Sequence, residues 1–381
     1  MPQKLLYHIY MSAPGGTTVP KYRRVYNALR SDIVEGALGS GERLPSEANL
    51  VKAFGASRIT IGRALRDLQQ EGLIVRRAGS GTYVRRARPP VPDRLSFGLL
   101  IPDLGETEIL EPIARSLTAA PMAREHVFLS GGGAPELSPV EKEQAAWERC
   151  QQYIERRVAG IFFAPVELTP NKDAVNGQIT AALQKAGIPV VLLDRSVVPY
   201  GCREAHDLVG IDNRRAGYQI TDHLLRLGSR RIAFLSFRNS ASTVDARRAG
   251  YREALHCHGA PVDPAYIVEL DRDAPHGVTR LMGAHRPEAI VCANDRTAGL
   301  VMQTLQSLGY GVPEDVRIVG IDDVHYASLL PVPLTTLRQP CHEIGTAAMA
   351  AMLERLTSRA LPPRDILLHT PLIVRRSCGS P

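Results

Sequence analysis

Residues 46–72 read SEANLVKAFGASRITIGRALRDLQQEG, and this stretch predicts two short helices joined by a tight turn. Pro45 lies just outside the first helix and Ser46 caps it, and the helix runs through Phe54 to a stop at Gly55. The second helix begins at Ser57 and ends before residue 72. Two helices joined by a glycine-containing turn form a helix-turn-helix, whose second helix is the one that enters a major groove.

The segments on either side complete a small domain. Apolar residues recur at three- and four-residue spacing from Tyr22 to about Glu35, which predicts an amphipathic helix. Residues 73–77 and 82–86 are typical of short strands around a glycine-rich turn at 78–81. We therefore expect a winged helix-turn-helix, in which this hairpin is the wing.

Positive charge is concentrated in the same segment. Residues 21–88 hold 14 Lys and Arg against 6 Asp and Glu, although the whole chain of 381 residues has a net charge of only +7. The chain beyond residue 88 is therefore slightly acidic. A basic module attached to a near-neutral partner is the electrostatic pattern of a polyanion-binding domain.

The remaining chain predicts a linker and a large α/β region. Residues 1–19 are turn-rich and predict a flexible tail, 20–87 form the winged domain, and 88–94 form a stiff Pro-rich linker. Over residues 95–381, β-branched runs alternate with helical stretches, which predicts two doubly wound parallel α/β lobes that face a cleft. The predicted strands span residues 97–101, 160–163, 190–193, 208–211, 232–235, 289–292 and 316–321.

Several classes of protein do not fit the sequence. No apolar stretch approaches the roughly 18–20 residues of a membrane span, and no cleavable signal pattern precedes the first helix. The six cysteines form no CxxC pair, and the histidines show no HxxxH spacing, so we expect no metal. The glycines at 131–133 lack the Gly-Lys-Ser/Thr of a phosphate loop. We expect a cytoplasmic protein with reduced thiols, no cofactor and no catalytic residues.

Motifs in the winged domain resemble those of GntR-type regulators. They are GERLPSE at 41–47, SRITI at 57–61, EGLI at 71–74 and GSGTYV at 79–84, and they span every element of the module. The resemblance implies a transcriptional regulator that binds double-stranded operator DNA.

Residues 95–381 resemble the effector domain of LacI-type repressors, which shares the fold of periplasmic sugar-binding proteins. The motifs include VVLLD at 190–194, VGIDN at 209–213, RRAGY at 247–251 and CAND at 292–295. The combination with a GntR-type head resembles the arabinose-repressor group. It implies a homodimeric repressor that a small effector, such as a sugar or sugar derivative, releases from DNA.

Donors for base edges and phosphates are expected on the first turns of the second helix. Ser57, Arg58, Thr60 and Arg63 supply them, with Arg58 the main candidate. Taken without the surrounding module, the same residues also describe an ordinary solvated helix face. The sequence departs from the family pattern at Gly62, where arginine is common. One expected base or phosphate contact is therefore missing, and we expect the preferred operator to differ from those of relatives.

The preceding helix and the wing add further candidates. Arg43 and Ser46 are expected to contact phosphate, and the resemblance implies that Glu47 accepts from a cytosine amino group. A first-turn acid favoured by the helix dipole explains Glu47 equally well. The wing residues are expected to allow close approach of the backbone to DNA and a contact with phosphate. Turn geometry alone also explains these residues. The wing candidates are Gly79, Ser80 and Gly81.

Effector-binding residues are expected where strands end at the cleft. Polyhydroxylated ligands are held by charged planar groups that engage two hydroxyls each, and Arg247 and Asp295 are the main candidates. Each aspartate after a strand also fits a helix cap, and Arg247 also fits an interlobe ion pair. Asp322-Asp323 is expected to shape a loop. The further candidates are Asp103, Asp194, Asp271 and Gln339.

Three alternatives stay open at this point. A doubly wound domain fused to a winged helix also fits an enzyme such as a sugar kinase or dehydrogenase, although no phosphate-binding or catalytic motif supports one here. The head also fits a protein partner in place of DNA. A LacI-type effector domain also works with a co-repressor, in which case the ligand would strengthen DNA binding.

Overall fold

The chain forms two compact units, Met1–Pro92 and Asp93–Pro381, each of which is described by itself. The predicted tail at 1–19 and residues 88–93 of the predicted linker lie outside the described residues. The computed structural model describes residues 20–34, 38–39, 41–77, 80–84, 94–102, 108–131, 137–271, 274–358 and 360–380.

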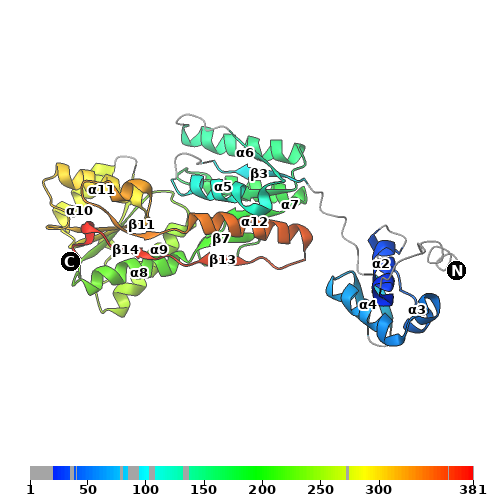
Figure 1. Ribbon diagram of the computed structural model, residues 1–381. Helices are drawn as coiled ribbons and strands as arrows, with labels where there is room; N and C mark the ends of the chain where they lie inside the picture. Colours follow the sequence, from blue (N-terminus) through cyan, green and yellow to red (C-terminus); the bar gives the residue numbers. More distant parts are fainter. Residues whose placement is uncertain are drawn as a thin grey trace. The chain divides into compact units, whose positions relative to one another are not determined.

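The smaller unit is a winged helix-turn-helix, which confirms the predicted fold (Figure 1). Within its described residues, three helices precede a two-stranded antiparallel hairpin. The elements are α2 (Lys21–Val34), α3 (Glu47–Phe54), α4 (Arg58–Gln70), β1 (Ile74–Arg77) and β2 (Gly81–Val84).

Local chemistry fixes the turn between α3 and α4. The Ser46 hydroxyl accepts from the backbone N–H of Asn49 (3.2 Å) and caps α3. Gly55 ends that helix with a φ of 58°, a left-handed conformation that glycine adopts without a steric penalty. Ser57 then caps α4 by accepting from the N–H of Thr60 (3.2 Å). These caps set the angle between the two helices.

One face of α4 belongs to the core of the smaller unit. Its apolar residues pack with side chains from α2, α3 and both strands. The chain before α3 runs beside the wing, where Leu44 N–H donates to Thr82 O and Val84 N–H donates to Glu42 O (2.8 Å each). The wing is therefore fixed to the helices by backbone hydrogen bonds. The α4 residues of this core are Ile61, Ala64, Leu65 and Leu68.

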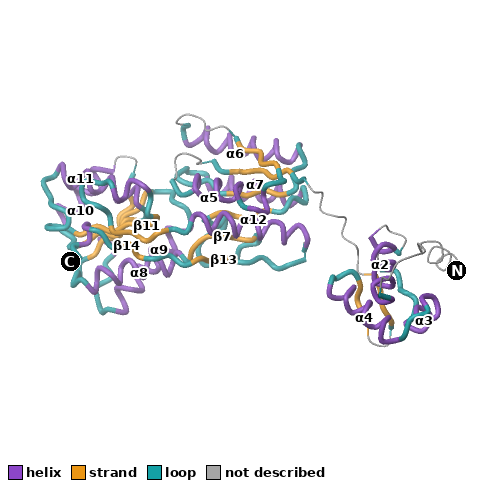
Figure 2. The backbone as a smooth tube through the Cα atoms, viewed as in Figure 1, coloured by secondary structure: helices purple, strands orange, loops and turns teal. Residues whose placement is uncertain are grey.

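The described residues of the larger unit form two lobes, as predicted, and each lobe contains a six-stranded sheet (Figure 2). The first lobe has the strand order β13-β7-β6-β5-β3-β4, and all of its strand pairs are parallel. Its strands are β3 (Ser96–Leu100), β4 (Val127–Ser130), β5 (Gly160–Phe163), β6 (Val190–Leu193), β7 (Asp207–Ile211) and β13 (Asp365–Leu368).

The second lobe has the order β14-β12-β11-β10-β8-β9, in which only β14 is antiparallel to its neighbour. Parallel strands place their carboxyl ends at one edge, where ligands bind in doubly wound folds. Its strands are β8 (Ile232–Phe237), β9 (Ile267–Leu270), β10 (Ala289–Cys292), β11 (Arg317–Asp322), β12 (Thr335–Arg338) and β14 (Leu372–Ile373).

Helices cover both faces of each sheet. In the first lobe α5 packs on α12 and α6 packs on α7, and in the second lobe α8 packs on α9 and α10 on α11 (Figure 1). None of the described helices has the length and apolar character to cross a membrane. The helices are α5 (Leu110–Ala119), α6 (Pro139–Glu155), α7 (Lys172–Lys185), α8 (Asn213–Arg226), α9 (Ser242–Cys257), α10 (Ala274–Ala284), α11 (Asp295–Ser307) and α12 (Cys341–Thr357).

The chain passes between the lobes three times. It leaves the first lobe between β7 and α8, returns between β12 and α12, and leaves again between β13 and β14. The first two crossings lie at residues 211–213 and 338–341. Side chains at these crossings are therefore near both sheets.

The seven strands predicted from sequence are present. The bounds of β5, β6 and β10 are as predicted, and those of the other four differ by one or two residues. Five further strands were not predicted: β4, β9, β12, β13 and β14. Four of these are the edges of the two sheets. Edge strands bury less of their surface, so they lack the continuous apolar run that marks a central strand.

Two glycines allow α8 and α9 to pack closely. A methyl group at Gly217 would overlap the carbonyl of Arg247, and one at Gly250 would overlap the carbonyl of Arg214. Tyr251 of α9 is buried against β8, where its hydroxyl donates to Ile232 O (2.7 Å) and its ring contacts Phe234. The backbone position of Arg247 therefore depends on the absence of two side chains.

We predict opposite effects on stability for a glycine substitution in α8, where the helices pack closely, and for one in α7, where they do not. We expect Gly217→Ala to lower the free energy of unfolding by about 1–3 kcal/mol, because an overpacked contact forces the backbones apart. Gly177→Ala in α7 is the matched control, since nothing lies within 4 Å of its added methyl. It should raise the free energy of unfolding by about 0.5–1 kcal/mol through helix propensity. Urea denaturation measures both, and equal effects of the two substitutions would contradict the close contact.

Candidate functional site

The outward face of α4 is exposed on the smaller unit. Arg58 is exposed in its first turn, and no acidic side chain among the described residues pairs with it. The guanidinium of Arg63 lies over the ring of Tyr22, 4.3 Å from its centroid, in a cation–π contact. Of these two predicted arginines, Arg58 therefore has the freer side chain.

The two predicted hydroxyl donors of α4 are paired with each other. Ser57 Oγ and Thr60 Oγ1 lie 2.8 Å apart, while Ser57 Oγ also accepts the N–H of Thr60. Their first role is therefore to cap the helix. One hydroxyl proton of the pair stays free for an outside acceptor, since a single hydrogen bond between two hydroxyls uses one of two protons.

The wing and the start of α3 are linked by side chains. Glu47 pairs with Arg76 of β1 (3.0 Å), and both groups are partly exposed. Arg43 pairs through its backbone with Tyr83, and its side chain passes over Gly81, whose φ is 122°. A methyl group at Gly81 would lie 2.7 Å from Arg43 Nε. Gly81 thus makes room for the arginine, in addition to shaping the turn.

Two more predicted residues belong to this surface. Ser46 caps α3 and is exposed, so its hydroxyl lies beside the N-terminus of that helix. Ser80 Oγ lies 2.7 Å from the hydroxyl of Tyr83. Gly79 lies outside the described residues. The described candidates thus come from the start of α3, the first turns of α4 and the wing.

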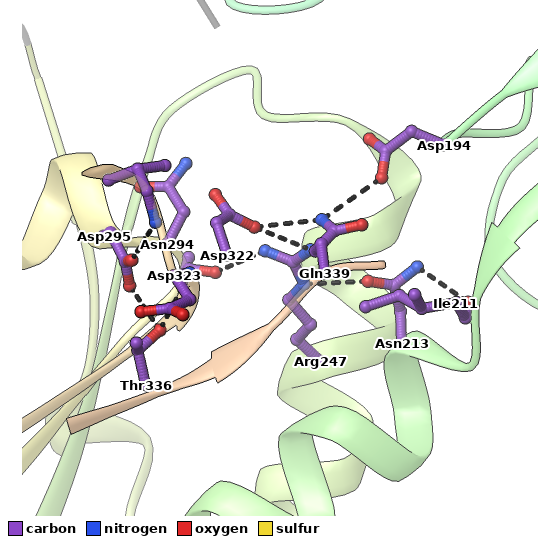
Figure 3. Close-up of polar contacts among 12 residues, drawn as sticks. Asp194, Ile211, Asn213, Arg247, Asn294, Asp295, Asp322, Asp323, Thr336 and Gln339 are labelled. Atoms are coloured by element: carbon purple, nitrogen blue, oxygen red, sulfur yellow. Dashed lines mark hydrogen bonds and ion pairs between the residues drawn. The ribbon is translucent and has the colours of Figure 1, made fainter. Parts of the chain in front are cut away.

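A buried arginine forms the centre of a polar cluster in the larger unit (Figure 3). The Arg247 side chain is only 4% exposed. Its Nε donates to Asn213 Oδ1 (2.8 Å) at the first crossing, and its Nη1 donates to Ala293 O (2.6 Å) after β10. Its Nη2 lies 3.7 Å from Asp322 Oδ1 at the end of β11.

Gln339 joins this cluster to the first lobe. Its Nε2 donates to Asp322 Oδ1 (2.9 Å) and lies 3.4 Å from Asp194 Oδ1, which follows β6 (Figure 3). Its Oε1 is buried and has no hydrogen-bond partner within the described ranges. Native proteins rarely leave such an acceptor unsatisfied. The amide oxygen is therefore available to a donor from outside the chain.

Asp295 lies beside the cluster, but its oxygens are already used. Oδ1 accepts from the Thr336 hydroxyl (2.6 Å) and Oδ2 accepts from Val324 N–H (3.1 Å). Gly320 makes room for the carboxylate, which a methyl group there would meet. In this structure Asp295 ties the start of α11 to β11 and β12.

The neighbouring aspartates have unusual backbones. Asp194, Asp322 and Asp323 have φ values of 65°, 135° and 54°, in the region that L-residues seldom adopt. Asp323 pairs with Arg338 and Arg375 (2.6 Å each), so it shapes the loop as expected. Asp322 points instead to the cluster, a role that sequence reasoning missed.

The electrostatics of the cluster favour protonated carboxyls. Burial raises the pKa of Asp322 well above its usual range, and Asp295 and Asp194 raise it further, against the Arg247 guanidinium and the Gln339 amide. Burial likewise raises the pKa of Asp295. One arginine thus faces more carboxylates than it can neutralise.

A second contact between the lobes lies next to the cluster. Arg195 is 1% exposed and pairs with Glu167 (2.5 Å), both from the first lobe. Glu167 Oε2 in turn accepts from Ala241 N–H of the second lobe (3.2 Å). Leu168 N–H donates to Asn239 O (2.8 Å) across the same gap. These bonds hold the lobes together beside Asp194.

The structure separates the predicted effector residues. Arg247, Asp194 and Gln339 come together, while Asp295 lies alongside. Asp271 pairs with Arg238 (2.9 Å) at the exposed end of edge strand β9, and no described contact joins it to the cluster. Asp103 lies outside the described residues.

Asn213 is a cluster residue that sequence reasoning did not single out. Its Nδ2 donates to Ile211 O (3.2 Å), which turns Oδ1 toward Arg247. The signal available was its place at the end of the 209–213 motif. The sequence position of Asn213, directly after a helix cap, does not indicate that its side chain contacts a buried guanidinium.

The raised pKa of Asp322 predicts a pH dependence of stability. Unfolded carboxyls titrate near pH 4, and the native state keeps its proton to higher pH. Above about pH 4 the native state thus binds more protons than the unfolded state, so stability falls as pH rises. We expect the Tm of Asp322→Asn relative to the wild type to increase from about pH 5 to 8. Asp271→Asn, at an exposed carboxylate, is the control.

Differential scanning fluorimetry on the full chain measures this difference. A Tm difference for Asp322→Asn that stays constant with pH would show that burial does not govern this carboxyl. A rise of equal size for Asp271→Asn would assign the effect to net charge.

Two known families match parts of the chain. Residues 21–84 match the family described as bacterial regulatory proteins, gntR family. Residues 221–378 match a periplasmic binding protein-like domain. The first match covers the winged unit. The second covers most of the second lobe, α12 and β13 of the first lobe, and the second and third crossings between the lobes.

The chain is also similar to known transcriptional repressors. The chain is 29% identical to the arabinose metabolism transcriptional repressor of Geobacillus stearothermophilus over 370 residues, 94% of this chain and 98% of the relative. It is 30% identical to the HTH-type transcriptional repressor PurR of Vibrio atlanticus (strain LGP32) over 241 residues, 61% of this chain and 68% of the relative.

Solved structures show the same fold. The transcriptional regulator CelR–cellobiose complex has a TM-score of 0.62 and 23% identity, and the match covers 95% of this chain and all of that one. The fold of the winged unit, the fold of the two lobes and the similarity to these repressors all indicate the same kind of protein. This chain therefore belongs to the effector-regulated bacterial transcriptional repressors that join a GntR-family DNA-binding domain to a LacI-type, periplasmic-binding-protein-like domain.

Proposed function

We propose that this chain represses transcription as a homodimer in the cytoplasm, and that a neutral sugar or sugar derivative bound between its lobes releases it from operator DNA. The proposed binding of an effector rests on one observation. The buried Gln339 Oε1 has no hydrogen-bond partner among the described residues and lies in the cluster with Asp194, Asp322 and Arg247. A hydroxyl-rich ligand offers donors to the amide and carboxylate oxygens, and acceptors to the guanidinium.

A neutral ligand suits this cluster better than an anion. The guanidinium of Arg247 already has acceptors in Asn213, Ala293 and Asp322, so it has little capacity left to hold an added negative charge. A hydroxyl pair can bridge a carboxylate and an amide without bringing charge. One relative is named for arabinose metabolism, and one solved relative carries cellobiose, which agrees with this ligand class.

The place of the cluster supports a mechanism of release. Asn213 and Gln339 stand at two of the crossings between lobes, so a ligand that takes over their hydrogen bonds changes the preferred angle between the lobes. In a dimer this angle sets the spacing of two heads on half-sites roughly 34–36 Å apart. A coupling of about 1–3 kcal/mol between ligand and DNA is typical of such regulators.

The proposed binding to operator DNA rests on the winged unit. Residues 21–88 hold 14 basic against 6 acidic residues, and Arg58 stands free on the outward face of α4. We assign Arg58 to a guanine edge, and Arg43, Ser46, Ser80 and Arg63 to phosphates. The Glu47–Arg76 pair favours a structural role for Glu47 over a contact with cytosine.

We expect Arg58→Ala to weaken binding to a selected operator duplex by about 10- to 100-fold, because a bidentate base contact is lost. Fluorescence anisotropy at about 50 and 200 mM salt measures this, since phosphate contacts make affinity salt-dependent. Arg124→Ala, an exposed arginine in the larger unit, is the control and should bind as the wild type does.

Two results would contradict this assignment. Retained operator affinity in Arg58→Ala would show that α4 does not read bases through this residue. Failure of the wild-type chain to bind any duplex at low salt would remove DNA binding from the proposed function.

We expect a thermal-shift screen of the full chain against arabinose, ribose and cellobiose to find a sugar that raises its Tm, because a ligand that binds only the native state stabilises it. Gln339→Ala should weaken that sugar about tenfold or more through the lost hydrogen bonds. Asp271→Ala, outside the cluster, should leave its affinity unchanged.

The same sugar tests the direction of regulation. It should weaken operator binding in the anisotropy assay, and stronger binding would replace release with co-repression. Turnover of the sugar by the purified chain would contradict the proposal that this protein is a regulator without catalysis.

A further inference from the structure

One side chain on the outward face of α4 is apolar. The exposed fraction of Ile59 is 82%, higher than that of any other exposed large apolar residue described in the chain. The helix buries Ile61, Ala64, Leu65 and Leu68 on its opposite side. With 3.6 residues per turn, residue 59 points directly away from that buried face.

The neighbours of Ile59 leave it open. Gly62, three residues further on, has no side chain, and nothing lies within 4 Å of where its Cβ would be. Internal packing therefore does not require glycine there, although glycine costs about 1 kcal/mol in a helix interior. The surface beside Ile59 is accordingly free for something that approaches from outside.

The polar groups around Ile59 are mostly engaged within the unit. Ser57 and Thr60 pair with each other, and Arg63 lies on the ring of Tyr22. Arg58 and Ile59 are therefore the side chains of the first turn best placed to meet bases. A guanidinium suits guanine, whereas an isoleucine needs an apolar partner.

The major groove offers one apolar group at its base edges, the 5-methyl of thymine. We propose that Ile59 packs on a thymine 5-methyl in each operator half-site, and that Gly62 leaves the space in which this base pair lies. The inference rests on the proposed entry of α4 into the major groove. It gives this repressor a thymine-reading residue, Ile59, beside Gly62, the position at which arginine is common in the family.

The test removes only the methyl group. Selection from a random duplex library with the full chain yields an operator, and each thymine of one half-site is then replaced in turn by deoxyuridine. Wild-type affinity should fall about three- to fivefold at one position, the effect of one buried methyl group. Ile59→Ala should bind the thymine duplex more weakly and should not distinguish thymine from deoxyuridine at that position.

Two further variants complete the comparison. Ile59→Val keeps a branched apolar side chain and should keep the preference for thymine. Val140→Ala, at an apolar residue of the larger unit that is 68% exposed, is the control and should behave as the wild type. Unchanged melting of Ile59→Ala confirms that the variant is folded, as its exposure predicts.

The outcomes separate the two proposals. Selection of no duplex by the wild-type chain would overturn the proposed function and this inference with it. Selection of an operator whose binding tolerates deoxyuridine everywhere would overturn only the methyl contact. Equal sensitivity of the wild type and Ile59→Ala to deoxyuridine would do the same, because the effect would then belong to the DNA alone.

Discussion

A guanidinium keeps its charge inside a protein, so the buried Arg247 must be satisfied by acceptors on several sides. Asn213, Ala293 and Asp322 supply them from a lobe crossing and from the ends of two strands. The arginine reaches these acceptors because Gly217 lets α8 and α9 approach closely. This single buried charge thus joins the ends of two strands of the second lobe to a crossing between the lobes.

The same cluster links the lobes to each other. Gln339 donates to an aspartate of each lobe and leaves its own oxygen without a partner within the described chain. A group that both holds the lobes and lacks one hydrogen bond is well suited to respond to a ligand, because ligand binding completes the hydrogen bonding and changes the contacts between the lobes. The bonds of Glu167 and Leu168 beside it give the lobes a second contact that such a change would disturb.

In the winged unit, internal contacts decide which side chains are left for DNA. Helix capping engages Ser57 and Thr60, a cation–π contact engages Arg63, and an ion pair engages Glu47. The outward side chains of the first turn of α4 that make no such contact are Arg58 and Ile59. If α4 enters the major groove as proposed, few of its side chains are left to read base edges, and phosphate contacts would contribute most of the affinity.

Sequence alone determined the elements whose chemistry is local. Ser46, Gly55 and Ser57 marked the ends of helices α3 and α4, and continuous apolar runs marked the central strands, because caps and burial periodicity act over a few residues. Only the tertiary structure showed that Asn213 and Asp322 join Arg247 and that Asp271 lies apart. These facts depend on where the chain crosses between lobes and how closely helices approach, which residue spacing along one chain does not encode.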